Sequence, residues 1–321
     1  MNKKLVALVF AGIFMLSACS TQSGLVNEQE ADVKASVEDN RFSTLTEATD
    51  GLTAAETASE EAEKTTVPFT DAVTSAPVTR PANSSSSGLS TKRREHSYGV
   101  AKNGKPHSIS VDNQKYFDSV NKGAFCLDTK TQEKVLYLTF DCGWENGYTF
   151  DVLDTLKEKN VPAAFFCTLD HIDAEPELIR RMIDEGHIVG NHSANHPDFS
   201  KISREKMTAE IKECEDRLVN DFGYTPVFFR YPEGAYSEDS LDLVYSLGYK
   251  TAFWSCAYAD WDVNNPKGAD YAFETVTARL HPGAVILLHS VSPDNAQALG
   301  KIIDYARAEG YEFRALTEFP V

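Results

Sequence analysis

The sequence lacks three features that mark common functional classes. It has no excess of basic residues: 31 Lys and Arg stand against 48 Asp and Glu, and the formal net charge is −17. That charge argues against nucleic acid or an anionic membrane surface as a partner. No apolar run reaches the roughly 20 residues that cross a bilayer. The cysteines after Cys19 are odd in number and contain no CxxC pair, so their spacing indicates no disulfide framework.

The first 19 residues resemble the signal of a bacterial lipoprotein. Lys3 and Lys4 form a short positive region, and Leu5 to Leu16 is an apolar run too short to span a membrane. The run ends in Leu16-Ser17-Ala18-Cys19, which looks like a lipobox, where cleavage leaves Cys19 as a lipidated N-terminus. We therefore expect a signal peptide over 1–19 and a lipid anchor on the extracytoplasmic face of the cell membrane. The alternative is an ordinary secretory signal cut nearby, with Cys19 incidental.

Residues 20–95 differ in composition from the rest of the chain. They are rich in Ser, Thr, Ala, Glu and Pro and have few large apolar side chains. Such a segment cannot bury enough surface to offset chain entropy, which predicts a disordered linker. A flexible chain of about 75 residues spans roughly 50 Å, so a tethered domain could sample a layer of wall. From residue 96 to residue 321 the composition is that of one globular domain.

Within 96–321, short apolar strands alternate with amphipathic helices. The expected strands cover 135–140, 163–167, 187–190, 227–229, 251–255, 285–288 and 311–315. The expected helices cover 148–157, 176–185 and 295–308, with two more capped by Ser203 and Ser237. This alternation predicts an α/β domain built on a parallel sheet or barrel. In such a barrel, chemistry gathers at the carboxyl ends of the strands.

Polar side chains with catalytic chemistry stand at or just beyond these strand ends. They are Asp141, His192, His196, Arg230, Asp260 and His289. Two carboxylates, three imidazoles and a guanidinium form a coherent catalytic set. Several also have a structural explanation: Asp141 as a helix cap, Arg230 as a buried arginine, and Asp260 in a packed corner. His289 is the most informative, because a histidine ending an apolar strand must find partners or face a cavity.

The two histidines of the Asn191–Pro197 segment are four residues apart. On one helical turn His192 and His196 would point the same way and could chelate a divalent ion. Pro197 disfavours a helical conformation at His196, so any such turn must be short. The HxxxH pattern is weak evidence by itself, and two surface histidines are the alternative.

Together these residues resemble the polysaccharide deacetylase family of carbohydrate esterases, whose domain is a distorted (β/α) barrel. Five family motifs occur in order, over a likeness that runs from about residue 134 to the C-terminus: Thr139-Phe140-Asp141-Cys142-Gly143, His192-Ser193-Ala194-Asn195-His196, Arg230-Tyr231-Pro232-Glu233-Gly234, Asp260-Trp261 and Leu287-Leu288-His289-Ser290. The resemblance implies removal of acetyl groups by a metal-dependent catalytic domain over 96–321.

The resemblance also implies roles for the motif residues. Asp141 would be the base and His289 the acid, while His192 and His196 would hold a divalent cation, which we expect to be zinc. Arg230 would orient Asp141, and Asp260 would orient His289. The remaining motif residues expected to contact substrate are Glu233, Trp261 and Leu287.

A narrower likeness points to one branch of the family, which makes muramic δ-lactam in spore cortex. It rests on Gly143 to Thr149, Asn265 to Gly268 and His289 to Ala296, and it extends back to about His96. The implied substrate is N-acetylmuramic acid in a peptidoglycan glycan strand, and the protein is expected to act as a monomer during sporulation. Two alternatives stay open: a deacetylase of N-acetylglucosamine or chitin-like chains, and a catalytically silent wall-binding lipoprotein.

Cys142 departs from the wider family, which has a second, metal-binding aspartate at this position. The narrower branch also tends to lack that aspartate. A Cys142 thiolate could replace the carboxylate and would favour zinc. Alternatively, the thiol packs against the strand end and water completes the metal shell.

Overall fold

The computed structural model describes residues 87–320 of the chain. The predicted signal peptide, the lipidation site Cys19 and most of the predicted linker lie outside these residues. Within the described part, no helix is both long enough and apolar enough to cross a membrane.

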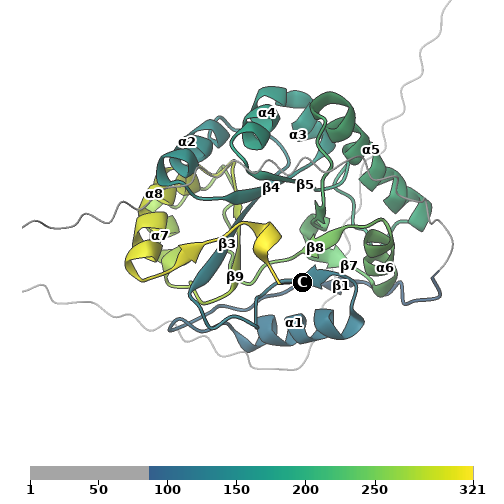
Figure 1. The fold of residues 1–321 in the computed structure, drawn as a ribbon, viewed down its shortest axis with the longest axis horizontal. Coiled ribbons are helices and arrows are strands. Elements are labelled where there is room, and N and C mark those ends of the chain that lie inside the picture. The colour runs from purple at the N-terminus through teal and green to yellow at the C-terminus, as the bar shows by residue number, and fades with distance from the viewer. Residues whose placement is uncertain (1–86, 321) are drawn as a thin grey trace, which may run out of the picture. The chain divides into compact units, whose positions relative to one another are not determined.

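Parallel strands form a ring at the centre of the described residues (Figure 1). In ring order they are β3 (Val135–Cys142), β4 (Ala163–Cys167), β5 (Ile188–Asn191), β6 (Phe228–Phe229), β8 (Lys250–Ala252) and β9 (Ala284–His289). β9 pairs with β3 on the side away from β4. Between β8 and β9 the ring closes through Ser255 and Cys256, whose backbones bond to Val285 and Leu287 of β9, and through a bridge between Leu127 and Ala284. The expected distorted (β/α) barrel is thus confirmed.

Four shorter strands lie around this ring. β10 (Glu312–Phe313) pairs with the start of β3, and β2 (Ala124–Phe125) pairs with β8. β1 (Arg94–Glu95) and β7 (Ala235–Tyr236) form a separate antiparallel pair. β1 precedes the predicted domain start at residue 96. Its two side chains are charged and exposed, so composition gives no sign of the pairing.

Helices surround the ring on its outside (Figure 1). They are α1 (Ser108–Val120), α2 (Thr149–Lys159), α3 (Leu169–Ala174), α4 (Pro176–Asp184), α5 (Arg204–Phe222), α6 (Glu238–Ser246), α7 (Ala269–Thr277) and α8 (Pro293–Ala308). The predicted caps are present: Ser203 accepts from the Lys206 N–H, and Ser237 forms a capping box with Ser240. Sequence patterns missed α1, α3 and α7. α3 has only six residues, and α7 begins after Gly268 without a capping side chain.

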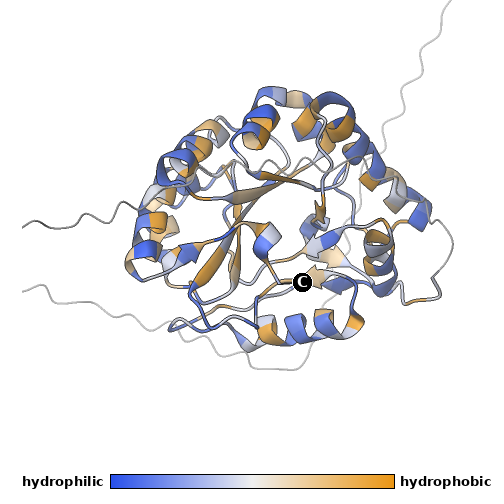
Figure 2. Cartoon of the chain, viewed as in Figure 1, coloured by the Kyte–Doolittle hydropathy of each residue, from blue (hydrophilic) through white to orange (hydrophobic). Residues whose placement is uncertain are grey.

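Side chains of β3 alternate between two apolar layers, because successive strand residues point to opposite faces. Leu136, Leu138, Phe140 and Cys142 belong to the layer that also holds apolar residues of α2, α4 and α8. Val135 and Tyr137 belong to the second layer, with Phe166 and Leu287. Figure 2 shows the strands β3 and β4 as largely hydrophobic, within a ring of helices of mixed character. By this alternation Asp141 faces the interior of the ring, and Cys142 faces the helices.

Candidate active site

A pocket of about 630 Å³ gathers most of the predicted site residues. Its lining includes Asp141, His192, His196, Glu233, Trp261, Leu287 and His289, together with Trp144 and Trp254, which the sequence did not single out. Arg230 and Asp260 are buried beside it and act through their neighbours. The strand ends thus bring the predicted set together, as expected for a barrel of this kind.

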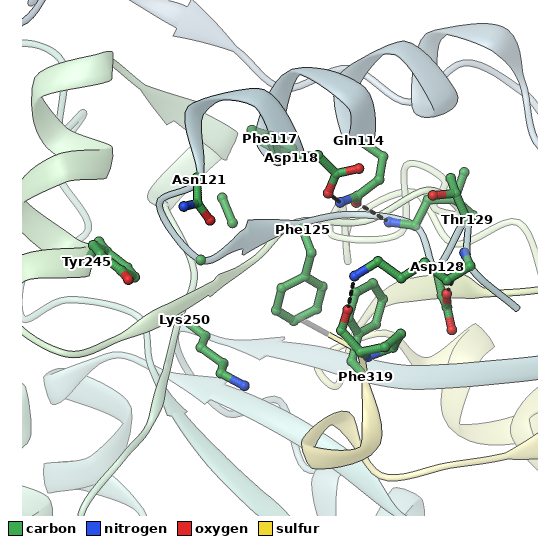
Figure 3. Close-up of a pocket in the computed structure, with 15 residues that line it drawn as sticks. Gln114, Phe117, Asp118, Asn121, Phe125, Asp128, Thr129, Tyr245, Lys250 and Phe319 are labelled. Atoms are coloured by element: carbon green, nitrogen blue, oxygen red, sulfur yellow. Dashed lines mark hydrogen bonds between the residues drawn. The ribbon is translucent and has the colours of Figure 1, made fainter.

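A second hollow of about 600 Å³ lies beside α1 and β2 (Figure 3). Lys250, the first residue of β8, lies on its wall. The side-chain oxygen of Gln114 accepts hydrogen bonds from the backbone N–H groups of Cys126 and Leu127, and its side-chain NH₂ donates to Asp118. The described residues that line this hollow include no histidine or cysteine. Gln114 therefore holds the chain after β2 against α1.

Asp141 is held as a carboxylate by a fully buried arginine. Arg230 Nη1 donates to Asp141 Oδ1 at 2.8 Å, and Arg230 Nε donates to the Ala252 carbonyl at 2.8 Å. The guanidinium lies over the Phe166 ring, 4.1 Å from its centroid. Burial would raise the pKa of Asp141, but the charges of Arg230, then His192 and His289, outweigh it and hold this pKa below its usual value.

The two histidines meet without the helical turn that their spacing suggested. Residues 192–197 form a loop in which Ser193 and His196 take left-handed φ values of 69° and 53°. Even so, the His192 and His196 ring centroids lie 4.8 Å apart. The loop is anchored because Glu210 of α5 accepts from the backbone and side-chain amides of Asn195. The two imidazoles therefore lie together through a loop, and not through the helical turn that Pro197 disfavours.

The surroundings of His192 fit a metal ligand. Its Nδ1 lies 2.9 Å from the Arg230 carbonyl, and its Nε2 lies 3.6 Å from Asp141 Oδ2. Burial lowers the pKa of His192 to about 4, and burial also lowers the pKa of His196. Both rings are therefore neutral near pH 7. A ligating histidine typically donates its other N–H to a backbone carbonyl, as His192 does here. Two neutral imidazoles beside a carboxylate thus fit a divalent cation.

His289 is oriented from behind by Asp260. Its Nδ1 lies 2.7 Å from Asp260 Oδ1, and its backbone N–H donates to Asp260 Oδ2 at 2.8 Å. Asn295 also donates to Asp260, and its own side-chain oxygen accepts from Tyr258. Burial would lower the pKa of His289, but Asp260 and then Asp141 outweigh it and raise this pKa. His289 can therefore carry a proton, with Nε2 left for the pocket.

The predicted substrate contacts Glu233, Trp261 and Leu287 line the pocket, and Leu287 does so as a buried side chain. Trp261 is 59% exposed, and its ring centroid is 5.8 Å from that of His289. Trp144 is 49% exposed and lines the same pocket. Glu233 has a left-handed φ of 56°, a conformation that a non-glycine residue keeps at some cost and that recurs at functional sites. Exposed indole faces beside polar groups suit a sugar ring.

Cys142 is the one predicted metal-binding residue that does not line this pocket. Its side chain is fully buried in the outer apolar layer, with Sγ 3.3 Å from the Ser290 hydroxyl. The alternation of β3 turns it away from the face that carries Asp141. This position corresponds to the packed-thiol alternative and not to a third ligand beside His192 and His196.

Comparison with known proteins agrees with this geometry. The polysaccharide deacetylase family matches residues 128–252. The peptidoglycan-N-acetylmuramic acid deacetylase PdaA of Bacillus subtilis is 43% identical over 189 residues, which are 59% of this chain and 72% of that protein. A peptidoglycan-N-acetylglucosamine deacetylase of Bacillus cereus is 32% identical over 206 residues, 62% of this chain and 73% of the relative.

The fold is also similar to that of a solved member of the family. The solved structure of Bacillus subtilis PdaA, described as a family 4 carbohydrate esterase, superposes with a TM-score of 0.68 at 38% identity. The superposition covers 72% of this chain and 98% of the PdaA chain. Fold, motif order and sequence identity over most of a relative's length agree, and the chain belongs to the polysaccharide deacetylase family.

Proposed function

We propose that this protein hydrolyses the N-acetyl group of N-acetylmuramic acid in peptidoglycan, which allows muramic δ-lactam to form. The family includes hydrolases acting on carbon–nitrogen bonds, which are typically metal-dependent, and it also includes pseudoenzymes. One observation carries the catalytic part of the proposal. Asp141, whose pKa is lowered by Arg230, and His289, whose pKa is raised by Asp260, face one pocket from neighbouring strands.

These residues provide the proton transfers of amide hydrolysis. Asp141 Oδ2, left free by Arg230, accepts a proton as water attacks the acetamide carbonyl carbon. As the C–N bond breaks, His289 donates a proton to the nitrogen, so that a neutral amine leaves and acetate remains. The backbone near Glu233 would stabilise the negative oxygen between these steps. His192 and His196 would hold a divalent cation, for which we expect zinc, and this cation would supply Lewis acidity and lower the pKa of a water molecule.

The choice of muramic acid rests on two kinds of support. The relative at 43% identity is named for N-acetylmuramic acid, whereas the relative named for N-acetylglucosamine is 32% identical. The segments of the narrower likeness also contact one another. Asn146 donates to the Val291 carbonyl at 3.0 Å, and Asp294 accepts hydrogen bonds from the backbone N–H groups of Lys267 and Gly268. These contacts hold the three segments together, and Val291 among them lines the pocket.

The proposed setting is the outer side of the cell membrane. A peptidoglycan substrate lies outside that membrane, and the predicted lipobox at Cys19 would tether a monomer there. The predicted linker over 20–95 would then let the catalytic domain reach glycan strands. Resemblance to the cortex branch favours a role in sporulation, and a vegetative role stays open beside it.

Mass spectrometry of purified peptidoglycan fragments tests the proposal. The full chain is incubated with them, with and without added zinc, beside Asp141→Asn and the matched control Asp154→Asn, which changes an exposed carboxylate on α2. Loss of one acetyl group from muramic acid, absent with Asp141→Asn and retained with Asp154→Asn, is the expected result. Loss from glucosamine would replace the substrate with that of the first alternative. No loss from either sugar with any divalent cation would favour a silent wall-binding lipoprotein.

A further inference from the structure

Three side chains that bind soft metals gather behind the active site and take no part in the proposed chemistry. They are Cys142, Cys167 and His171, whose ligand atoms all lie within 4.8 Å of one another. Cys142 ends β3 and Cys167 ends β4, and the two are register partners in the parallel sheet. His171 lies in the first turn of α3, which begins two residues after Cys167. The two strand ends and the helix thus converge on one point.

All three side chains are fully buried, and both thiols are free. None of them lines the pocket that holds His192 and His196. Cys142 and Cys167 belong to the apolar layer between the ring and the helices. Solvent and substrate therefore do not reach these groups from the catalytic side.

His171 is the least expected member of the cluster. Neither of its ring nitrogens has a hydrogen-bond partner among the described residues, although the ring is 0% exposed. A buried polar group without a partner costs free energy, so such a group calls for a ligand. Burial lowers the pKa of His171 to about 4, which leaves the ring neutral near pH 7 with a nitrogen lone pair available.

The geometry points to a structural site for a zinc-class cation, formed by Cys142, Cys167 and His171 and separate from the His192–His196 pair; we propose this site as new. Two sulfurs and one imidazole are a donor set that zinc prefers. Tetrahedral zinc with S ligands at about 2.3 Å needs sulfurs about 3.8 Å apart, so small side-chain rotations complete the site. On binding, the two thiols release two protons and the cation gains two thiolates and one nitrogen.

Neighbouring groups support such a site. The Ser290 hydroxyl, 3.3 Å from Cys142 Sγ, can donate to the thiolate or occupy the fourth position. Thr168 follows Cys167, caps α3 through the His171 N–H, and donates to the Gly143 carbonyl. A cation here would lock the ends of β3 and β4 together directly behind Asp141. The site would therefore stabilise the strand end that carries the proposed base.

A disulfide between Cys142 and Cys167 is the rival use of these thiols, since exported proteins meet oxidising conditions. It would leave both nitrogens of His171 buried without partners, whereas a cation gives one of them a ligand. The metal site therefore accounts for all three residues, and the disulfide accounts for two.

Cobalt titration distinguishes these uses by a readout other than activity. The full chain is purified with a non-thiol reductant, stripped of metal and titrated with Co²⁺. We expect a thiolate-to-cobalt charge-transfer band in the near ultraviolet that saturates within two equivalents, one for each proposed cation site, and disappears when Zn²⁺ is added. Cys142→Ser and Cys167→Ser should abolish the band, and His171→Gln should weaken Co²⁺ binding at least tenfold. Cys126→Ser, another buried free cysteine, is the matched control and should keep the band.

The titration of the wild-type chain tests the proposed site even if a variant of Cys142, Cys167 or His171 fails to fold. Absence of a thiolate band in the reduced wild-type chain would overturn the proposal. So would a Cys142–Cys167 disulfide found by non-reducing peptide mapping of protein recovered from its native compartment. The double variant His192→Gln/His196→Gln should keep the band while deacetylation is lost. If instead it loses the band, the thiolate belongs to the active-site cation and the separate site is wrong.

Discussion

Asp141 and His289 are register partners on the adjacent strands β3 and β9. The parallel pairing therefore places a carboxylate and an imidazole side by side at the same end of the ring. Each has its own buried partner, Arg230 for the carboxylate and Asp260 for the imidazole. These partners move the two pKa values apart, and that separation lets one residue accept a proton while the other donates one at the same pH.

The pH profile should respond to the Asp260–His289 pair. Asp260 raises the pKa of His289 above 6.5, so the donating form persists until pH rises through that higher value. Asp260→Asn removes the negative charge, and the alkaline limb of kcat/KM should then move to lower pH. Rates measured across pH 5–9 for wild type and variant would check this, with the exposed Asp262→Asn as control. An alkaline limb at the same pH in Asp260→Asn would show that His289 is not the group that titrates there.

Arg230→Gln should destabilise the protein strongly. It leaves Asp141 without its buried counter-charge and removes the guanidinium from the Phe166 ring. Breaking a buried ion pair from one side costs about 3–5 kcal/mol. Urea unfolding at pH 7 would measure the change in free energy of unfolding. Arg314→Gln, which removes surface pairs with Glu133 and Glu312, should cost below about 1 kcal/mol. Equal costs for the two variants would contradict the structural role given to Arg230.

Gly190→Ala should damage the site through packing. A Cβ at this position would lie 2.4 Å from Phe166 Cδ1, and Phe166 supports the Arg230 guanidinium. Overpacking a core costs about 1–3 kcal/mol, and displacement of Arg230 should also lower kcat/KM. Gly300→Ala is the matched control, because a Cβ there meets only ordinary contacts at 3.7 Å or more within α8. That control should be neutral or slightly stabilising, since alanine favours helix. Thermal unfolding and kinetics of both variants would test the difference.

The sequence predicted the groups that touch the pocket better than the groups that hold them. Apolar runs and strand-end polar residues are visible in the order of the chain, so Asp141 and His289 could be identified. Asn295, Glu210 and Tyr258 could not, because their roles depend on which elements meet in space. α1 was missed because its capping residue is His107, not one of the usual short polar caps.

The position of the Cys142 side chain also could not be predicted from the sequence. The family pattern suggests a ligand at this position, and the residue type suits zinc. Only the alternation of β3 and the register with Cys167 reveal that its thiol faces His171 instead of His192. The residues that could bind one metal ion together are adjacent across the sheet, and the order of the sequence does not show which residues these are.

Trp261→Ala should weaken substrate binding with little effect on stability. The ring is 59% exposed and stands beside His289, so its loss removes a sugar-stacking surface without opening the core. Loss of about 1–2 kcal/mol of contact should raise KM about tenfold. kcat should change less than KM, because in the proposed site the indole would stack on the sugar and not on the acetyl group. Tyr305→Ala is the control, since that ring is 40% exposed on α8 and packs against Phe273, outside the pocket. A fall in kcat with unchanged KM would instead assign Trp261 to the positioning of His289.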